Sequence, residues 1–319
     1  MCTAFQVNWQ KLWVFSLLYF PFQKVKKGEQ NKVLLKVYRR AYYLSVWYPL
    51  VYANTFATLY NKPLKASEKK AAIYAAAIAV MFDALFDDLD FDLKKLAVMI
   101  DSPNNYYPET RIEQLMLQLH KNMLKHVLPE RVDNFKQMVH AVFKAQTLSL
   151  KQKENPTAEE LTDITLQKGG YSALLFRSLL NYPLFSETDK EVVYLMGGFF
   201  QLLNDVTNTS SDIRTQTTTL ATYCKTPVEI NNCLNQFRSN VIQKIAILPE
   251  APNWSKQKIG FKFYVLSIWG YAHIKKLHFE QVNGITNPKP FKWTIPYSVY
   301  GFKLMFFRDY ENLQFNAIA

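Results

Sequence analysis

Apolar residues recur at helical spacing in long segments of this chain, and no section has the alternating pattern of a strand. The pattern predicts helices over residues 30–60 (with a break near Pro49), 69–92, 111–128, 132–152, 161–180, 186–205, 226–247 and 254–282. Ser67, Thr157 and Ser186, each followed by acidic residues, are the expected N-caps of three of these helices. The Gly169–Gly170 pair predicts a break or kink inside the helix over 161–180.

Composition supports an all-helical fold. The chain has 319 residues, of which 49% are hydrophobic and only nine are glycine. Few glycines argue against sheets with many tight turns, and this length can bury a large core. We find neither an internal repeat nor a low-complexity linker. We therefore predict one all-α domain over residues 1–319, with residues 1–65 as its N-terminal helical segment.

Three cysteines and one short apolar segment indicate the cellular compartment in which we expect the protein. Cys2, Cys224 and Cys233 are few and odd in number, which favours a reducing, cytoplasmic environment over a disulfide framework. The segment KLWVFSLLYF (11–20) is too short to span a bilayer, and no alanine-type cleavage site follows it. We expect it to pack on the core, and a peripheral contact with a membrane stays open.

The chain is basic, with a formal net charge of +12. Such a charge is compatible with nucleic acid, an anionic membrane or a phosphorylated substrate. Basic residues are spread along the chain apart from one cluster, which comprises Lys24, Lys26, Lys27, Lys32, Lys36, Arg39 and Arg40. No nucleic-acid motif accompanies this cluster, so we do not expect nucleic-acid binding.

Five aspartates fall within MFDALFDDLDFD (81–92), directly after an apolar helical segment. On a helix Asp83, Asp87 and Asp90 lie within about 60° of one another, and Asp88 and Asp92 form a second pair on a neighbouring face. Like charges one turn apart repel each other, and acidic groups oppose the dipole at a helix C-terminus. A hard cation such as magnesium would offset both effects. The alternative is an acidic helix end in solvent.

Polar residues at helical spacing also occur in GGFFQLLNDVTNTSSD (197–212), directly after an apolar run. We call this row and the row of aspartates in 81–92 the two polar stripes. Asn204, Asn208 and Asp212 are four residues apart, which places their side-chain oxygens on one helix face. One such stripe also suits a helix that is simply ending in solvent. Two polar stripes on separate helices suggest the facing walls of one metal–diphosphate site.

These segments resemble the metal-binding motifs of class I isoprenoid (terpenoid) synthases, and most closely those of bacterial class I terpene synthases. Asp87-Asp88-Leu-Asp-Phe-Asp92 resembles the bacterial terpene synthase motif, whereas Asp83-Ala-Leu-Phe-Asp87-Asp88 resembles that of squalene and phytoene synthases. Both registers stay open. Residues 204–212 resemble the second motif, Asn-Asp-x-x-Ser/Thr-x-x-x-Glu, with Asn and Asp at its last two ligand positions. The metal ligands implied by the resemblance are Asp83, Asp87, Asp88, Asn204, Asn208 and Asp212.

Three further matches are less specific. Leu166–Tyr171 resembles the kinked helix on which prenyl diphosphate synthases carry a diphosphate-binding lysine, here Lys168. Gln201 follows two phenylalanines, like the Phe-Gln before the second motif of those enzymes. Tyr264 to Gly270 resembles the Tyr…Trp-x-Gly helix of bacterial terpene synthases, and Arg308-Asp309-Tyr310 follows it at a longer spacing than the family's Arg-Tyr pair. The diphosphate-sensing arginine of terpene synthases has no match, and Lys168 is its expected substitute.

The resemblance implies a helical bundle with the active site in a central cavity and three Mg²⁺ ions, for which Mn²⁺ could substitute. It implies that a prenyl diphosphate ionises to an allylic cation, which then cyclises or captures water as diphosphate leaves. Asp87 and Lys168 are the expected catalytic residues. The expected substrate-binding residues are Lys168, Gln201, Arg308, Tyr310 and the aromatic Phe82, Phe86, Tyr171, Phe200 and Trp269. Aromatic faces can stabilise a cation, although core packing is the simpler expectation for any one of these rings.

Two other functions stay open. A head-to-head condensation of the squalene or phytoene type fits the register that begins at Asp83. A non-catalytic prenyl-lipid binding protein with the same fold fits the irregular second motif. Chain elongation is disfavoured because the basic run KVYRR (36–40) lacks the glycine of the usual second diphosphate site. A homodimer is compatible with all three functions.

Overall fold

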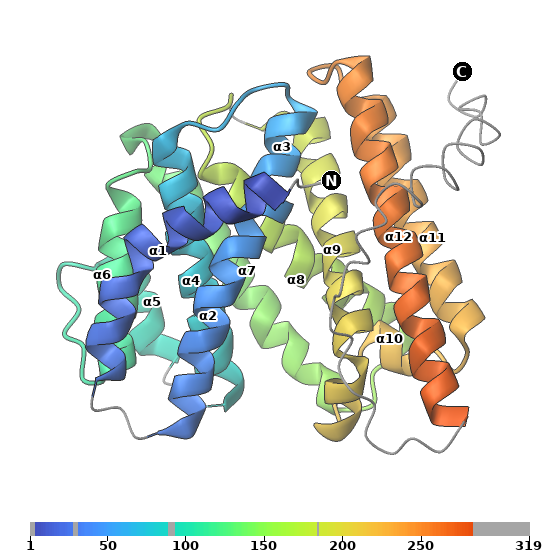
Figure 1. The fold of residues 1–319 in the computed structure, drawn as a ribbon, viewed down its shortest axis with the longest axis horizontal. Helices are drawn as coiled ribbons and strands as arrows, with labels where there is room; N and C mark the ends of the chain where they lie inside the picture. The colour runs from blue at the N-terminus through green and yellow to red at the C-terminus, as the bar shows by residue number, and fades with distance from the viewer. Residues whose placement is uncertain (1–3, 28–30, 89–92, 184, 283–319) are drawn as a thin grey trace.

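The computed structural model describes residues 4–27, 31–88, 93–183 and 185–282, and the regular structure in these ranges is helical throughout (Figure 1). The predicted all-α fold is confirmed. The α-helices are α1 (Ala4–Lys26), α2 (Lys32–Val51), α3 (Ala53–Leu59), α4 (Ala66–Asp88), α5 (Leu93–Asp101), α6 (Arg111–Leu124), α7 (Val132–Ser149), α8 (Ala158–Ser178), α9 (Glu187–Arg214), α10 (Leu220–Tyr223), α11 (Pro227–Ala246) and α12 (Asn253–Val282). Two 3₁₀ turns, Pro129–Arg131 and Leu150–Lys153, flank α7.

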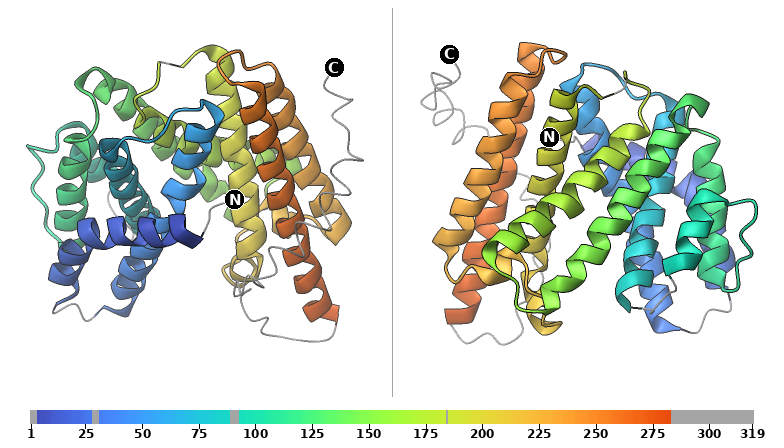
Figure 2. Two further views of the ribbon diagram at one scale, coloured as in Figure 1. Left: turned by 45° about the horizontal axis from the view of Figure 1, so that its top comes forward. Right: turned by 180° about the vertical axis from the view of Figure 1, so that it is seen from behind.

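Helices α8 and α9 form the centre of the bundle. Their contact is the most extensive one between two helices in the described part of the chain. On one side of α9 the long helices α11 and α12 pack together, and α1, α5 and α6 lie at the opposite side of the molecule (Figure 1). Seen from behind, α7 and α8 cross that face side by side (Figure 2). Helix α2 packs on α4 at the front.

Side-chain hydrogen bonds to the backbone fix the residues at which α8 and α9 begin. Thr157 caps α8 in a reciprocal arrangement with Glu160, whose carboxylate accepts the Thr157 backbone N–H at 2.8 Å. Ser186 caps α9 by accepting the Asp189 backbone N–H at 3.1 Å. The caps predicted at Thr157 and Ser186 are therefore confirmed, whereas the cap predicted at Ser67 is wrong because α4 already begins at Ala66. The break near Pro49 falls later than predicted, because α2 continues through Pro49 and the chain turns at Tyr52.

Helix α8 continues through the glycine pair, so the break is wrong among the two features, break or kink, predicted at Gly169–Gly170. These glycines serve close packing instead. A Cβ added to Gly169 or to Gly197 would lie closer than 3.0 Å to the other glycine's backbone carbonyl. Gly170 and Gly198 are equally tight, against the Tyr194 ring and Leu166. The backbones of α8 and α9 therefore meet without side chains between them.

A buried ion pair fixes the connection between the same two helices. Arg177 Nη2 lies 2.8 Å from Asp189 Oδ2, and both side chains are almost fully buried. The guanidinium also lies about 5 Å from the ring centres of Tyr60, Tyr182 and Phe185. Removing either charge would leave the other buried without a partner, which is strongly destabilising.

The close contact between Gly169 and Gly197 predicts that a methyl group added there destabilises the fold more than one added at a less tightly packed glycine. Gly197→Ala should lower the free energy of unfolding by about 1–3 kcal/mol, because the new Cβ meets rigid backbone. Gly270→Ala is the matched control, since its Cβ would lie 3.0 Å from a Leu203 methyl and 3.1 Å from a Leu234 methyl, both at flexible ends. Chemical denaturation of both variants measures this, and equal stabilities would contradict the packing argument.

Candidate active site

A cavity of about 150 Å³ lies between α2 and the helices α4 to α9. Its interior is mainly apolar, and the lining side chains there include Tyr52, Ile78, Phe82, Met99, Met116, Met123, Phe135, Val139, Val142, Leu175 and Phe176. Polar side chains also line it, namely Arg40, Tyr48, Asp83, His120, Gln146, Lys168, Ser172, Gln201 and Asn204. An apolar chamber with a few convergent polar groups is the usual form of a small-molecule site.

Asp83 lies at the centre of the charged part of the cavity. Its Oδ1 accepts a hydrogen bond from Gln146 Nε2 at 3.0 Å and lies 3.7 Å from Lys168 Nζ. Its Oδ2 lies 3.6 Å from Arg40 Nη2. These four side chains come from α4, α7, α8 and α2, so the cluster exists only in the folded bundle.

The cluster carries two positive charges and one negative charge. Arg40 and Lys168 keep part of their surface exposed, and ion pairs of that kind contribute little stability. Neither cation is therefore held tightly by Asp83. An anionic ligand that reached the cavity could accept charge-assisted hydrogen bonds from both.

The second wall of the site belongs to α9. Asn204 lines the cavity, and its Oδ1 accepts a hydrogen bond from Asn208 Nδ2 at 3.1 Å. Asp205 turns to the interior instead, where Gln201 Nε2 donates to its Oδ1 at 2.8 Å and burial raises its pKa to about 7. Asp212 lies two turns beyond Asn204, and partial burial raises its pKa to about 6.

The first acidic motif is described only in part. Asp83 and Phe82 line the cavity. Asp87 and Asp88 end α4, but their side chains and that of Phe86 lie outside the described residues. Asp90 and Asp92 lie outside them entirely, so the choice between the two registers stays a prediction. No group of three or more His, Cys, Asp and Glu side chains gathers as a metal site within the described ranges.

The other predicted residues lie in different surroundings. Lys168 and Gln201 line the cavity beside Asn204. The Phe200 ring belongs to the core, 5.3 Å from the Phe263 ring and 5.2 Å from the Tyr52 ring. Tyr171 packs on Tyr194, and Trp269 lies near His273. Neither Tyr171 nor Trp269 is among the residues that line the cavity. Arg308 and Tyr310 lie outside the described residues.

Five polar residues of the cavity were not singled out from the sequence for this site: Arg40, Tyr48, His120, Gln146 and Ser172. Arg40 and Tyr48 are eight residues apart on α2, a spacing that places both on one helix face. Burial, with the Asp83 charge nearby, raises the pKa of Tyr48 to about 12. Its hydroxyl therefore stays protonated at neutral pH and remains a donor.

His120 is the polar residue in the apolar interior. It is 5% exposed, and its Nε2 has no hydrogen-bond partner among the described residues. Burial lowers the pKa of His120 to about 4, against a hydrogen bond with the Ile100 backbone that raises it. The imidazole is therefore neutral at physiological pH.

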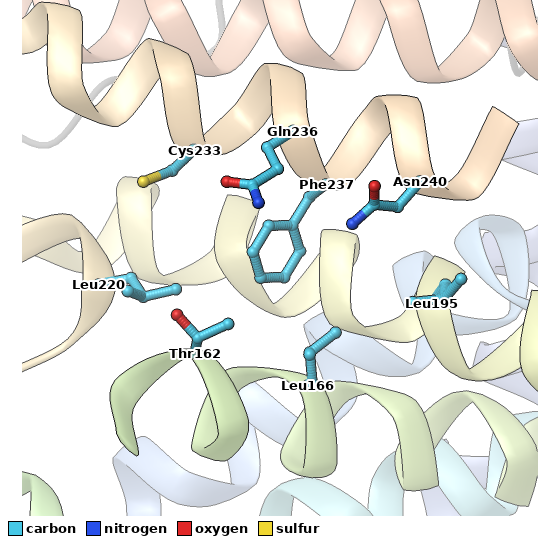
Figure 3. Close-up of a pocket in the computed structure, with 8 residues that line it drawn as sticks. All are labelled: Thr162, Leu166, Leu195, Leu220, Cys233, Gln236, Phe237 and Asn240. Carbon is cyan, nitrogen blue, oxygen red and sulfur yellow. The ribbon is translucent and has the colours of Figure 1, made fainter. Parts of the chain in front are cut away.

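A second cavity, of about 120 Å³, lies between α8, α9, α10 and α11 (Figure 3). It is lined by Thr162, Leu166, Leu195, Leu220, Cys233, Gln236, Phe237 and Asn240, none of which is a charged residue. The Cys233 Sγ lies 3.9 Å from the Cys224 Sγ, and the two cysteines are not bonded. None of the predicted site residues lines this cavity, so the cavity with Asp83 is the candidate active site.

Comparison with known proteins identifies no family. No family model matches the sequence, and no curated protein is similar to it. Among solved structures, a geranyltransferase from Legionella pneumophila is similar, with 13% identity, a TM-score of 0.48, and coverage of 83% of this chain and 98% of that chain. Since a TM-score below 0.5 does not establish a shared fold, the function has to be inferred from the cavity itself. No helix among the described residues is long and apolar enough to cross a membrane.

The buried His120 predicts a loss of stability in acid. Its folded pKa of about 4 lies below its ordinary value of 6.5, so the unfolded chain binds the proton more tightly. Stability is therefore complete above pH 6.5 and falls as the pH drops towards 4. This residue should cost about 2 kcal/mol of unfolding free energy between pH 7 and pH 5.

Urea denaturation at both pH values tests this. His120→Phe should remove that part of the loss, whereas His140→Phe, at an exposed position, should keep it. A His120→Phe protein that loses as much stability on acidification as the wild type would contradict the assignment.

Proposed function

We propose that the protein is a class I terpene synthase, which ionises a prenyl diphosphate and lets the cation cyclise or capture water. One observation carries the proposal, namely an apolar cavity with Asp83, Arg40 and Lys168 on one wall and Asn204 on another. The cations suit a diphosphate, and the chamber suits a hydrocarbon chain. The two polar stripes and their resemblance to terpenoid synthase motifs support the same chemistry.

In this mechanism Arg40 and Lys168 bind the diphosphate. As the carbon–oxygen bond breaks, negative charge develops on the leaving group, and fixed donors near it lower the barrier. The Tyr48 hydroxyl, also on this part of the cavity, would donate a further hydrogen bond. Asp83 keeps both cations near the cavity before substrate arrives, through loose contacts at 3.6 and 3.7 Å that leave them able to bind an anion.

The donor set suits magnesium in type, because the polar stripes offer oxygen atoms, the ligands that Mg²⁺ prefers. Asn204, Asn208 and Asp212 would hold it on α9, and Asp83, Asp87 and Asp88 on α4. When bound, Mg²⁺ would neutralise charge on the diphosphate and so assist its departure.

The chamber would then protect the allylic cation from water. Phe82, Tyr52 and Phe176 line it, and their faces can stabilise a cation by roughly 0.5–2 kcal/mol each. The Tyr52 and Phe176 rings stack 5.0 Å apart, which fixes their orientation. Which product forms depends on how these rings fold the chain.

Diphosphate release tests the proposal. The wild type should release diphosphate from geranyl, farnesyl or geranylgeranyl diphosphate in a magnesium-dependent reaction. Arg40→Gln and Lys168→Gln should each lower kcat/KM about 10- to 100-fold, the value of one lost charge-assisted hydrogen bond. Arg39→Gln is the matched control, because Arg39 precedes Arg40 on α2 and does not line the cavity.

The control should stay within about twofold of the wild type, since surface charges contribute little locally. The proposal fails if no substrate is turned over. It also fails if Arg39→Gln and Arg40→Gln lower the rate equally.

Head-to-head condensation is the second candidate. It is favoured by Asp83, because Asp83 lines the cavity and belongs only to the squalene and phytoene synthase register. Mass spectrometry of organic extracts separates the two functions. A product with one substrate skeleton supports the terpene synthase, and a product with two supports condensation. Tight binding without turnover would instead support the prenyl-lipid carrier.

A further inference from the structure

Helix α1 is apolar on two opposite faces, but only one of them is buried. Val14, Leu18 and Phe22 point into the core. The other face is exposed along the described part of the helix, and we call it the α1 aromatic face. It consists of Trp9, Leu12, Phe15, Tyr19 and Phe20.

This face is continuous rather than scattered. The Phe15 and Tyr19 rings lie 4.5 Å apart, and the Tyr19 and Phe20 rings 5.4 Å apart. Leu12 is 61% exposed and Phe20 is 76% exposed. Single exposed apolar residues are ordinary, but a contiguous row of them on one helix marks an interaction site.

The charged residues of α1 have one sign, and Glu29 is the one acidic residue in the sequence between α1 and Lys36. Between residues 4 and 28 the sequence has four lysines and no acidic residue. Lys24 and Lys27 are exposed at the end of α1, and Lys32 and Lys36 are exposed at the adjoining start of α2. Figure 1 shows this end of the α1–α2 pair at the same end of the bundle as the C-terminal ends of α4 and α9. Those helix ends carry the polar stripes of the candidate active site.

We propose that the α1 aromatic face docks on an anionic membrane surface, with the lysines at the α1–α2 end next to the lipid headgroups. Trp, Tyr and Phe are the side chains that favour the membrane–water interface, and lysines beside them add attraction to anionic lipid. The helix would lie in the plane of the interface rather than cross it. If the substrate is a prenyl diphosphate, as the proposed function has it, a substrate molecule dissolved in the lipid would then lie close to the cavity.

The charge pattern favours a membrane over a second copy of this chain. Two identical α1 faces packed on each other would contribute lysines from both copies and no acidic partner from either α1 helix. Like charges placed together oppose association. An anionic lipid surface satisfies the apolar row and the lysines at once.

Vesicle flotation tests the proposal with the full chain and needs no turnover, so its result is independent of the catalytic assay. The wild type should bind vesicles of equal parts phosphatidylglycerol and phosphatidylcholine, and bind pure phosphatidylcholine more weakly. Leu12→Ser with Phe20→Ser should lower the partition coefficient about tenfold. Lys24→Gln with Lys27→Gln should lower binding to the anionic vesicles alone, also about tenfold, and reduce its salt dependence.

The matched control is Val228→Ser with Ile247→Ser. These residues are each 63% exposed on and just after α11, so the control removes similar apolar surface elsewhere. It should bind as the wild type does. The proposal is overturned if the wild type does not bind anionic vesicles, or if the control loses as much binding as the α1 variant. It is also overturned if the wild type is a dimer in solution that Leu12→Ser with Phe20→Ser dissociates.

Discussion

The close approach of α8 and α9 is the constraint on which the rest of the structure depends. The two helices meet at Gly169 and Gly197, where either Cβ would collide with the opposite backbone. Lys168 precedes the first glycine, and Gln201 follows the second by one turn. A Cβ on Gly169 would even collide with the Gln201 side chain. Without this contact, Lys168 of α8 and Asn204 of α9 would not line the same cavity. The Arg177–Asp189 ion pair fixes the connection between these helices.

Around this pair, the charged cluster and the apolar chamber are assembled from helices far apart in sequence. Arg40, Asp83, Gln146 and Lys168 come from four helices and converge on one carboxylate. The carboxylate positions two cations without fully neutralising them, because all three groups keep partial contact with water. Such an arrangement is prepared for an anion before the anion arrives, and preorganisation of this kind is the main source of electrostatic stabilisation in enzymes. The apolar interior behind it excludes water from the rest of a substrate.

The fold could be read from the sequence wherever local physics decides it. Helical periodicity located α8, α11 and α12 to within a few residues, whereas α9 continues to Arg214, well beyond its predicted end at residue 205. The caps at Thr157 and Ser186 follow from side-chain hydrogen bonds to nearby N–H groups. Gly169–Gly170 was misread, because a glycine pair suggests a break when no partner helix is visible. Only the position of Gly197 on α9 reveals that the missing side chains leave room for another backbone.

The residues of the candidate site also differ in whether local sequence or distant contacts place them in the cavity. Asp83, Lys168, Gln201 and Asn204 were named from local spacing and resemblance, and all four line one cavity. Arg40, Gln146 and His120 could not be named, because nothing in their own segments shows which distant residue they face. Whether an aromatic candidate lines the cavity depends on the direction of its side chain, which helical periodicity does not determine. Phe82 lines the cavity, whereas Phe200 packs in the core among other rings.

The proposed function depends on Arg40 and Lys168 binding the diphosphate of a prenyl substrate in this cavity. The most direct measurement is calorimetric titration with farnesyl thiolodiphosphate, an analogue that resists ionisation, in the presence of magnesium. We expect the wild type and Arg39→Gln to bind it with similar affinity, and Arg40→Gln with Lys168→Gln to bind it at least about tenfold more weakly. Equal affinity in all three proteins, or no binding to the wild type by this or the geranyl and geranylgeranyl analogues, would contradict this expectation.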